Sequence, residues 1–573
     1  MKKLAIMTVR GVLGLLPSAI KTSLKKNSRL TEFYSRSLRK SGLLYGFPSA
    51  KKLQAMYKDC LAQQQRLLAD VNPEPIRCNV VITGTNAKDV RASLNALLPF
   101  QSQVVNIFLD PEVLQKIASG EYAQWQLESY ETLHKLAELP LLAIHAGDKV
   151  DMNTLCRVLS SELYTSESAV CYFDWHYLDK KGKLANAQLL PDWNPDLQLS
   201  TGYVHTAIWL PSPQSVFAQC SLKSCDYDLA VWFAAIALER IIVPYHMAVS
   251  VLARNSAAKS VTPVQAIAEK LAKQAAPVAN TKINTVQALW PLVDSPKVSL
   301  IIPTYNGQDL VRACVTSILE KTTYHNYEIL LVDNNSNDPE CLAYFDELDK
   351  HPKVRLLKYP HPFNYSAINN FAVKHAKGEV VGLVNNDIEV ITPEWLEYMA
   401  GHAMREDIGC VGAKLLYSDG RIQHAGVVLG YGGGAGHAHK YFPRYHPGYM
   451  KRLIATQNYS AVTAACLLVR KSKFEEVGGL NEDDLQVAFN DVDFCLRVLE
   501  TGVRNLYCAE AELYHHESVS RGLDITPEKA ARFNRELNYL QTRWKKYIDH
   551  DPAYNPNLTR KRENFAIKGK DEY

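Results

Sequence analysis

Short apolar segments alternate with helix-like segments along most of the chain. Residues 80–82 and 104–109 are apolar runs of strand length, and the residues between them carry apolar side chains at helical spacing. Residues 298–302 and 328–332 repeat this order of strand, helix and strand in the second half of the chain. Strands that alternate with helices predict an α/β fold built on a mostly parallel sheet.

The repeated order predicts two copies of one α/β domain, because Asn86 and Asn306 follow the first strand at the same place in each copy. A basic helical arm is expected before the first copy and a helical linker between the two. The expected boundaries are 1–70 for the arm, 71–255 for the first domain, 256–295 for the linker, 296–550 for the second domain and 551–573 for a C-terminal tail. The tail is polar and rich in Pro and Asn, which indicates a strap or a loose segment.

The charges are spread unevenly along the chain. The first 50 residues hold ten Lys and Arg against one acid, Glu32, whereas the whole chain has 64 basic and 60 acidic residues and a net charge of +4. So small a net charge does not favour binding to nucleic acid. A basic arm that also carries apolar side chains predicts contact with an anionic membrane surface. Docking of the arm on the chain's own acidic body is the alternative.

Cysteine spacing and hydropathy bear on the compartment. The 12 cysteines include no pair at the CxxC spacing, so they predict neither a zinc finger nor a disulfide framework. The longest apolar stretch near the N-terminus, residues 4–16, is shorter than the roughly 20 residues that a membrane-spanning helix needs. We therefore expect a cytoplasmic protein with reduced thiols.

Three polar clusters stand where predicted strands of the second half end. They cover residues 303–306, 333–338 and 385–387. In an open parallel sheet, ligands bind at the carboxyl ends of the strands, and a carboxylate there can accept a hydrogen bond from a base or hold a divalent cation. Polar residues after a strand also form ordinary turns, but three such clusters at one edge favour a binding site.

Two further clusters carry acids and histidines. Residues 490–493 stand at the predicted start of a helix, where the helix dipole alone also favours acids. The adjacent His515 and His516 lack the spacing of a zinc-binding helix, but one imidazole could complete a metal site rich in oxygen ligands. Residues 430–435 satisfy the glycine pattern of dinucleotide sites. A helix is not expected after them, so they indicate a mobile flap instead.

The segment from about 297 to 550 resembles glycosyltransferase family 2, whose members have the GT-A nucleotide-sugar-binding fold. It is most similar to the rhamnosyltransferase-like members that build bacterial O-antigen and capsule. The strings that carry the resemblance are VSLIIPTYNG, YEILLVDNNSND, FNYSAINN, GEVVGLVNNDIEV, QHAGVVLG, FNDVDFCLR, YHHESVSRG and DPAYNPNL. The first half resembles the same fold more faintly, through CYFDWHYLDKKGKL and LLPDWNPDLQLSTGYV.

We therefore expect two GT-A-like domains in tandem, of which the first is a degenerate, non-catalytic copy. Residues 145–148 offer a single acid, Asp148, where the second half has its metal motif, and nothing in the first half matches the NDVD and HHES strings. A second active transferase domain and a false repeat are the alternatives.

The resemblance also implies a set of site residues. Asp491 matches the catalytic base, and Asp387 stands in the place of the acidic metal motif, with His515 or His516 as a further ligand of Mn²⁺ or Mg²⁺. The residues implied to bind the donor are Thr304, Tyr305, Asn306, Asp333, Asn335, Asn370, Asn385 and Asn386. Those implied at the acceptor side or in a flap are His424, Gly433 and Asp493.

The expected function is that of an inverting, metal-dependent glycosyltransferase. It would move a sugar from a UDP- or dTDP-linked donor to a polyprenyl-linked acceptor of a bacterial surface polysaccharide, at the inner face of the inner membrane. A divalent ion neutralises the charge that builds on a leaving diphosphate, and a carboxylate takes the proton of the acceptor hydroxyl. Asn385 and Asn490 stand where the family usually has acids. These two departures motivate the alternative of a non-catalytic carbohydrate-binding scaffold in a polysaccharide assembly complex.

Overall fold

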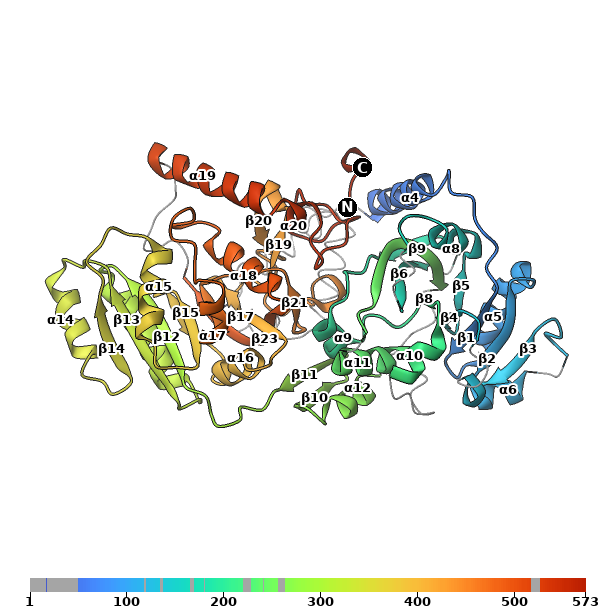
Figure 1. Cartoon of the computed structure of the whole chain (residues 1–573), viewed down its shortest axis with the longest axis horizontal. Helices are drawn as coiled ribbons and strands as arrows, with labels where there is room; N and C mark the ends of the chain where they lie inside the picture. The colour runs from blue at the N-terminus through green and yellow to red at the C-terminus, as the bar shows by residue number, and fades with distance from the viewer. Residues whose placement is uncertain are drawn as a thin grey trace.

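The computed structural model describes residue 17 and residues 50–117, 120–133, 138–164, 169–179, 181–219, 228–240, 242–255, 263–516 and 526–573 of the 573-residue chain. Most of the arm expected over 1–70 therefore lies outside the described residues. The arm's described part includes helix α4, Ala50–Leu67. Within the described residues, no helix is both long and apolar enough to cross a bilayer. Figure 1 shows two lobes side by side, one for each half of the chain.

The first lobe is built on a sheet with the strand order β3-β2-β1-β4-β8-β6-β9-β5, and β7 pairs with β6 outside this path. The strands are β1 Cys78–Thr83, β2 Val104–Leu109, β3 Gln126–Ser129, β4 Leu141–His145, β5 Asp148–Val150, β6 Cys171–Leu178, β7 Leu184–Gln188, β8 Ile208–Leu210 and β9 Tyr245–Asn255. The helices named for this lobe are α5 Ala87–Leu97, α6 Pro111–Lys116, α8 Met152–Leu159, α9 Pro195–Thr201, α10 Pro213–Gln219 and α11 Leu229–Glu239.

The second lobe is built on a sheet with the order β14-β13-β12-β15-β22-β17-β23-β16. Its strands are β12 Val298–Thr304, β13 Tyr327–Asp333, β14 Val354–Lys358, β15 Val380–Val384, β16 Ile388–Val390, β17 Ile408–Leu416, β22 Cys466–Arg470 and β23 Arg504–His515, with β18 Ile422–His424 and β21 Gln457–Tyr459 paired outside the path. Its helices are α13 Gln308–Lys321, α14 Pro339–Leu348, α15 Tyr365–His375, α16 Trp395–Ala403, α17 Lys471–Glu476, α18 Asn490–Glu500, α19 Pro527–Arg543 and α20 Lys545–Asp549.

The two sheets have the same topology. Strand by strand, β1 to β6 correspond to β12 to β17, and β8 and β9 correspond to β22 and β23. In each sheet the strands of the path run in one direction except two, which are β8 and β5 in the first and β22 and β16 in the second. The α/β fold with two domains of one kind, predicted from the sequence, is confirmed.

The apolar runs of the sequence form the central strands because helices cover both faces of the sheet. Every residue of β13 is buried, and so are the four Val, Leu and Ile residues of β12. The first strand of each copy ends in a different turn. The Asn86 side chain caps α5 by accepting from Lys88 N and Asp89 N, whereas α13 follows Gly307, whose φ of 70° favours glycine.

The segment expected as a helical linker is helical only in part. The described helix α12 covers Val264–Leu271, and a hairpin of β10, Ala276–Asn280, and β11, Thr285–Leu289, follows it. The Asn280 side chain accepts from Lys282 N and Ile283 N, and Asn284 has a φ of 57°, so the polar residues form a hairpin turn. Val286 and Trp290 then pack against α11 and α12 in a small separate core. Figure 1 places this hairpin at the junction of the two lobes.

Buried polar contacts join the two lobes. Helix α9 of the first lobe meets β21 of the second, where Asn194 Nδ2 donates to Asn458 O at 2.8 Å. Asp196 pairs with Arg405 at 2.6 Å. The buried charges of Asp196 and Arg405 thus compensate each other across the interface.

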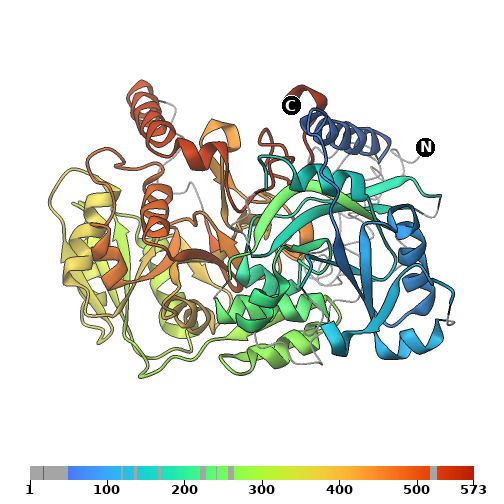
Figure 2. The ribbon, with the colours of Figure 1, turned by 45° about the vertical axis from the view of Figure 1, so that its right-hand side comes forward.

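The C-terminal segment, expected as a strap or a loose tail, packs over both lobes. Asn555 Nδ2 donates to Asp174 of β6 at 3.0 Å, and Asp551 accepts from Leu429 N at 2.7 Å. The side chains of Tyr554 and Phe565 are buried. Figure 2 shows the C-terminus beside α4, where the two also make contacts. The segment is therefore a strap that links the two copies.

Candidate active site

The carboxyl ends of β12 and β13 form the first part of the site. Thr304 and Asp333 are register partners at these two ends. The Asp333 carboxylate is nearly buried and accepts from Ser336 N at 2.9 Å, and Asn386 Nδ2 donates to Thr304 Oγ1 at 3.1 Å. Tyr305 follows Thr304 with 54% of its surface exposed. These groups offer hydrogen-bond acceptors and an aromatic ring at one edge of the sheet.

Asn306 and Asn335, which were expected to bind the sugar donor, shape the loops that follow β12 and β13. Asn306 Oδ1 accepts from Asn337 N at 3.0 Å and from Asp338 N at 3.2 Å, and its backbone has a φ of 48°. Asn335 has a φ of 62° and donates to His361 O at 3.1 Å. Both residues therefore hold turns at the strand ends, which is the ordinary role of Asn after a strand.

Asn370 is not brought to the strand ends. It lies on α15, where its Oδ1 accepts from Leu480 N at 2.8 Å and its Nδ2 donates to Leu480 O at 2.8 Å and to Glu482 at 2.9 Å. Since these bonds engage both ends of the amide, Asn370 fastens the loop before α18.

Asp387 and His515 form the second part of the site. The strands β16 and β23 pair with Ile388 opposite His515, so Asp387, just before β16, lies beside the end of β23. His515 Nε2 is 3.2 Å from Asp387 Oδ1 and 3.2 Å from Asn385 Nδ2. Asp387 and His515 are each 6% exposed. The Asp387 carboxylate and the His515 imidazole thus meet at a place with little exposure to solvent, next to Asn386. We call this pair the acid–histidine corner.

The two adjacent histidines have different partners, because successive side chains of a strand point to opposite faces. His516 Nε2 lies 3.3 Å from Glu389 Oε2, and its Nδ1 lies 2.7 Å from Ser418 Oγ. The imidazole beside the Asp387 carboxylate is that of His515, whereas His516 contacts Asp387 only through its backbone N–H, which donates to Asp387 O at 3.0 Å. In the described part of the chain, no three His, Cys, Asp or Glu side chains are grouped as a metal site.

Asp491 stands in the first turn of α18. Its Oδ2 accepts from Ala464 N at 3.1 Å and its Oδ1 accepts from Val492 N at 2.9 Å. Burial raises the pKa of Asp491, although these backbone donors work in the opposite direction. A carboxylate with a raised pKa is a stronger proton acceptor than an ordinary aspartate, as a general base needs.

Asp493, two residues further, is a packing residue. It is fully buried, and its two oxygens accept from Trp544 Nε1 and Arg497 Nε, each at 2.8 Å. The bond from Trp544 ties α18 to the start of α20, and the bond from Arg497 lies within α18, so both oxygens of Asp493 are used in packing.

Tyr365 joins the two halves of the site, although no spacing or cluster in the sequence marks it as a site residue. Its hydroxyl lies 3.3 Å from Asn385 Oδ1 and 3.2 Å from Ala464 O. Asn385 contacts His515, and Ala464 contacts Asp491. The only signal in the sequence was its place in the FNYSAINN string.

A pair of neutral histidines borders the Asp491 side of the site. His424 Nδ1 lies 2.9 Å from His437 Nδ1. His424 Nε2 accepts from Gly426 N at 3.3 Å and Thr463 N at 3.5 Å, so its proton is on Nδ1 and the proton of His437 is on Nε2. Burial lowers the pKa of His437 to about 3 and that of His424 well below its usual range. His424 is fully buried, and His437 is the partly exposed member.

Gly433 belongs to a packed hairpin turn and not to a dinucleotide loop. The strands β19, Val427–Leu429, and β20, Ala435–His437, pair on either side of the glycines. Gly433 O accepts from Gln541 Nε2 of α19 at 2.8 Å, and a Cβ at Gly434 would lie 2.8 Å from Leu537 Cδ1. The glycines are needed for this close approach to α19.

The first copy has an ion pair where the second has Asp387 and His515. In the pairing of β5 with β9, Asp148 stands opposite Arg254, as Ile388 stands opposite His515. The Arg254 guanidinium binds Asp148 through Nε at 2.5 Å and Nη2 at 2.9 Å, and both side chains are fully buried. The Arg254 guanidinium therefore neutralises the Asp148 carboxylate.

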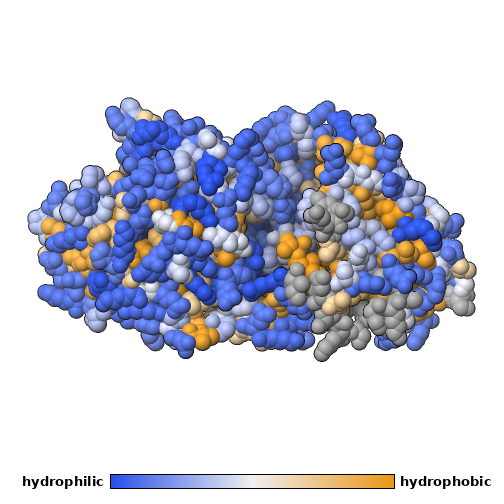
Figure 3. Space-filling model, viewed as in Figure 1, coloured by the Kyte–Doolittle hydropathy of each residue, from blue (hydrophilic) through white to orange (hydrophobic). Residues whose placement is uncertain are grey.

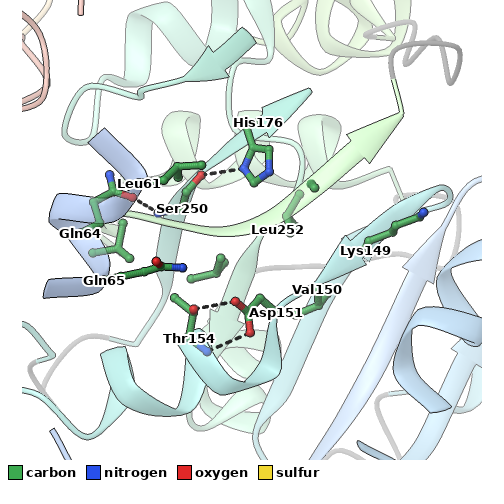
Figure 4. A pocket seen from close by; sticks show the side chains of 13 residues that line it. Leu61, Gln64, Gln65, Lys149, Val150, Asp151, Thr154, His176, Ser250 and Leu252 are labelled. Carbon is green, nitrogen blue, oxygen red and sulfur yellow. Dashed lines mark hydrogen bonds between the residues drawn. The ribbon is translucent and has the colours of Figure 1, made fainter. Parts of the chain in front are cut away.

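The first copy also holds a small cavity of about 270 Å³ between α4 and β9 (Figure 4). Its polar groups bind one another: His176 Nδ1 lies 3.2 Å from Ser250 Oγ, and Thr154 Oγ1 donates to Asp151 at 2.7 Å. Burial lowers the pKa of His176 to about 4, so its imidazole is neutral at physiological pH.

Comparison with known proteins identifies the second lobe. Residues 299–478 match the family model described as glycosyl transferase family 2. The chain carries a glycosyltransferase family 2 domain. This match covers the strand-end cluster and Asp387, and the segment that follows it supplies Asp491 and His515.

Two curated relatives match most of this chain. The "uncharacterized protein y4gI" of Sinorhizobium fredii (strain NBRC 101917 / NGR234) is 42% identical over 441 residues, which are 73% of this chain and 48% of that protein. The O-antigen biosynthesis protein RfbC of Myxococcus xanthus is 36% identical over 434 residues, which are 72% of this chain and 33% of that protein. The chain thus spans half or less of the length of these relatives.

A solved structure also matches. The structure of GalNAc-T7 with UDP, GalNAc and Mn²⁺ has a TM-score of 0.37 and 15% identity, over 48% of this chain and 52% of that one.

Proposed function

We propose that this family 2 domain transfers a sugar from a nucleotide-sugar donor to a glycan acceptor of a bacterial surface polysaccharide, with inversion at the anomeric carbon. The observation that carries the proposal is the contact path from Asp491 through Ala464, Tyr365 and Asn385 to His515. It joins a carboxylate with a raised pKa to an acid–histidine corner at the nucleotide-binding edge of the sheet.

The donor is held at the strand ends. The Asp333 carboxylate accepts from the base, Tyr305 offers its exposed ring, and Thr304 and Asn386 border the diphosphate side. The choice between UDP- and dTDP-linked donors then depends on this edge of the site. A panel of nucleotide sugars, assayed by release of the nucleoside diphosphate, tests which donor is used.

The residues at the corner fit a divalent cation. Asp387 offers carboxylate oxygen and His515 offers imidazole nitrogen, a donor set suited to Mn²⁺ or Mg²⁺ whose other ligands come from a diphosphate and water. When bound, such an ion neutralises the charge on the leaving diphosphate. The protein's part is to hold Asp387 and His515 together, through the pairing of β16 with β23. Full activity in excess EDTA would contradict a metal requirement.

Asp491 acts as the general base. It accepts the proton of the acceptor hydroxyl as that oxygen attacks the anomeric carbon from the face opposite the diphosphate, which inverts the configuration. The backbone donors Ala464 N and Val492 N hold the carboxylate in place. The stereochemistry of the product, measured by NMR, tests the inversion.

A surface polysaccharide is supported as the acceptor class by the similarity to a protein named for O-antigen biosynthesis. A polyprenyl-linked acceptor fits a chain that associates with the anionic inner leaflet through the basic residues of its first 50 positions. Sedimentation with anionic vesicles, compared between the full chain and a chain that begins at residue 52, tests this association. Equal binding by both, or binding indifferent to salt, would contradict it.

A non-catalytic carbohydrate-binding scaffold is the second candidate function, because Asn385 and Asn490 replace acids expected from the family pattern. Steady release of nucleoside diphosphate in the presence of an acceptor supports the enzyme. Tight glycan binding without release would support the scaffold.

We propose that the first copy is non-catalytic. Its metal corner is filled by the buried pair of Asp148 and Arg254, which leaves the acid neutralised without an ion from solution. Its role is then to support the second lobe and its acceptor.

A further inference from the structure

A large cavity of about 1380 Å³ lies between the two lobes. Its wall combines β7 of the first lobe, the β10–β11 hairpin, residues 442–454, the strands β17 and β23, and residues 564–567 of the strap. It is larger than the roughly 300–1,000 Å³ that hold a drug-sized ligand. Figure 3 shows that the surface between the two lobes is hollowed and mostly hydrophilic.

The lining of this cavity combines rings with amides. The rings are Tyr57, Phe442, Tyr445, Tyr449 and Phe565, and the amides are Asn186, Gln188, Asn280, Gln287 and Asn564. Of these rings, Tyr445 and Tyr449 are partly exposed, whereas the others are buried. An exposed aromatic face can bury the C–H face of a sugar, and amides donate to and accept from its hydroxyls. Such a lining suits a carbohydrate, whose rings have apolar C–H faces and hydroxyl groups around their edges.

Three of the four Lys and Arg side chains that line the cavity are bound by the protein itself, and the fourth, Lys282, is exposed at the hairpin turn. Lys414 and Arg444 both pair with Glu512, at 2.8 and 2.5 Å. Lys451 donates to Asn284 O at 2.6 Å, and burial lowers its pKa to about 8. The arrangement therefore favours a neutral ligand over a phosphate or a lipid headgroup.

The cavity is connected to the candidate active site by a short segment of chain. Phe442, which lines the cavity, accepts through its O from Ile422 N at 2.7 Å. Ile422 begins β18, which ends at His424, the buried member of the histidine pair. The cavity and the Asp491 side of the site are thus held together by one strand.

Two stacked rings lie between the cavity and the end of β23. Tyr441, which precedes Phe442, is 42% exposed, and its ring stacks on that of Tyr417 with centroids 5.1 Å apart and planes at 12°. Ser418, the next residue after Tyr417, contacts His516. Arg421 and Lys440 also lie over the Tyr441 ring, 5.0 and 5.4 Å from its centroid, so this exposed surface combines aromatic rings with cationic hydrogen-bond donors.

We propose that the interdomain cavity is a distal acceptor subsite that binds several units of a neutral glycan, with the Tyr417–Tyr441 pair under the units nearer the catalytic corner. The proposal rests on the proposed function. It gives the first copy a part in acceptor recognition, because Asn186 and Gln188 belong to β7. It also predicts that the domain prefers long acceptors over short ones.

The test uses the full chain with a double variant, Gln287→Ala/Tyr445→Ala, whose two side chains line the cavity without being fully buried. The matched control is Gln101→Ala/Tyr245→Ala, which changes the same residue types on the first lobe away from the cavity. The acceptors are oligosaccharides of graded length, released by mild acid from the surface polysaccharide of the organism that encodes the chain.

We expect the KM for acceptors of about six units to rise at least tenfold in the cavity variant, since tenfold is about 1.4 kcal/mol of binding. The kcat, the donor KM and the KM for a single-unit acceptor should stay unchanged, and the control variant should behave as the wild type. An equal loss for short and long acceptors, or no loss, would overturn the subsite.

A binding measurement separates this proposal from the proposed function. Calorimetry with the six-unit oligosaccharide and no donor should show binding to the wild type and at least tenfold weaker binding to the cavity variant. That result supports the cavity even if no donor is turned over. Two results would overturn the proposal. One is oligosaccharide binding that is as strong in the cavity variant as in the wild type. The other is binding to anionic vesicles that the wild type and the control variant show and the cavity variant lacks.

Discussion

His515 Nε2 lies 3.2 Å from Asp387 Oδ1 because β16 and β23 pair with Ile388 opposite His515. The same strand pair in the first copy sets Asp148 opposite Arg254, and there the two charges neutralise each other. One topology thus gives an acid–imidazole corner in one copy and a closed ion pair in the other. The copies differ in the residue of the last long strand, Arg254 or His515, and in the place of the acid, which is within β5 in the first copy and just before β16 in the second.

Replacement of His515 should weaken the binding of the metal ion more than replacement of His516. In His515→Ala, the Mn²⁺ concentration for half-maximal activity should rise at least tenfold, which is about 1.4 kcal/mol of binding. His516→Ala is the matched control, because His516 faces Glu389 and Ser418 instead of Asp387. Activity titrated with Mn²⁺ after EDTA treatment measures both. A larger effect in the control would assign the ligand to His516.

Asp491→Asn should nearly abolish transfer without weakening donor binding. Loss of a general base costs about 10²–10⁴ in rate. Burial raises the pKa of Asp491, so its charged form disfavours folding at neutral pH, and the variant should be no less stable than the wild type. Rate, nucleotide affinity and urea unfolding are the measurements.

The pH dependence of the rate gives the same residue a second test. The carboxylate is the active form, so kcat of the wild type should fall as the pH drops through its raised pKa. This acid limb should be missing from the residual activity of Asp491→Asn. An acid limb that persists in the variant would assign it to another group.

The strap and the first lobe should separate more easily at alkaline pH. Buried His246 lies 3.0 Å from Asp174 Oδ1 and 3.2 Å from Asp192 Oδ1, and His550 of the second lobe also binds Asp192, at 2.8 Å. Burial alone lowers the pKa of His246, but the two carboxylates raise it to about 9.

Because the pKa of His246 is higher in the folded than in the unfolded protein, the charged imidazole stabilises the fold. This contribution is fully present at pH values below the unfolded pKa near 6.5 and is lost above about pH 9. The difference in unfolding free energy between wild type and His246→Gln should therefore be on the order of 3 kcal/mol at pH 6 and should shrink as the pH rises through 9. Urea unfolding at pH 6, 7.5 and 9.5 measures it. A difference that stays constant over this range would show that His246 is not charged.

Asp148→Ala should destabilise the first lobe, although Asp148 has no part in the proposed chemistry. It leaves the buried Arg254 guanidinium without its partner, which costs about 3–5 kcal/mol. Transfer per folded molecule should remain near the wild-type value. Unfolding curves combined with activity corrected for the folded fraction distinguish this from catalysis: lost activity in fully folded protein would make the first copy catalytic.

The sequence determined the class of fold and its repetition. Apolar runs of strand length with helical periods between them can be buried only in a layered α/β sheet, and the run of β13 is indeed buried at every position. The polar residues after these runs were expected at one edge, and Thr304, Asp333 and Asn386 meet there because parallel strands end at the same side.

Tertiary structure alone decided which polar residues meet. Local pattern cannot tell His515 from His516, because the choice depends on how β16 pairs with β23 far along the chain. Nor does it separate Asn370, engaged by Leu480, from Asn386 at the strand ends. Tyr365, the Arg254 pair and the interdomain cavity arise from contacts between segments distant in sequence, and such contacts carry no signal in local periodicity or spacing.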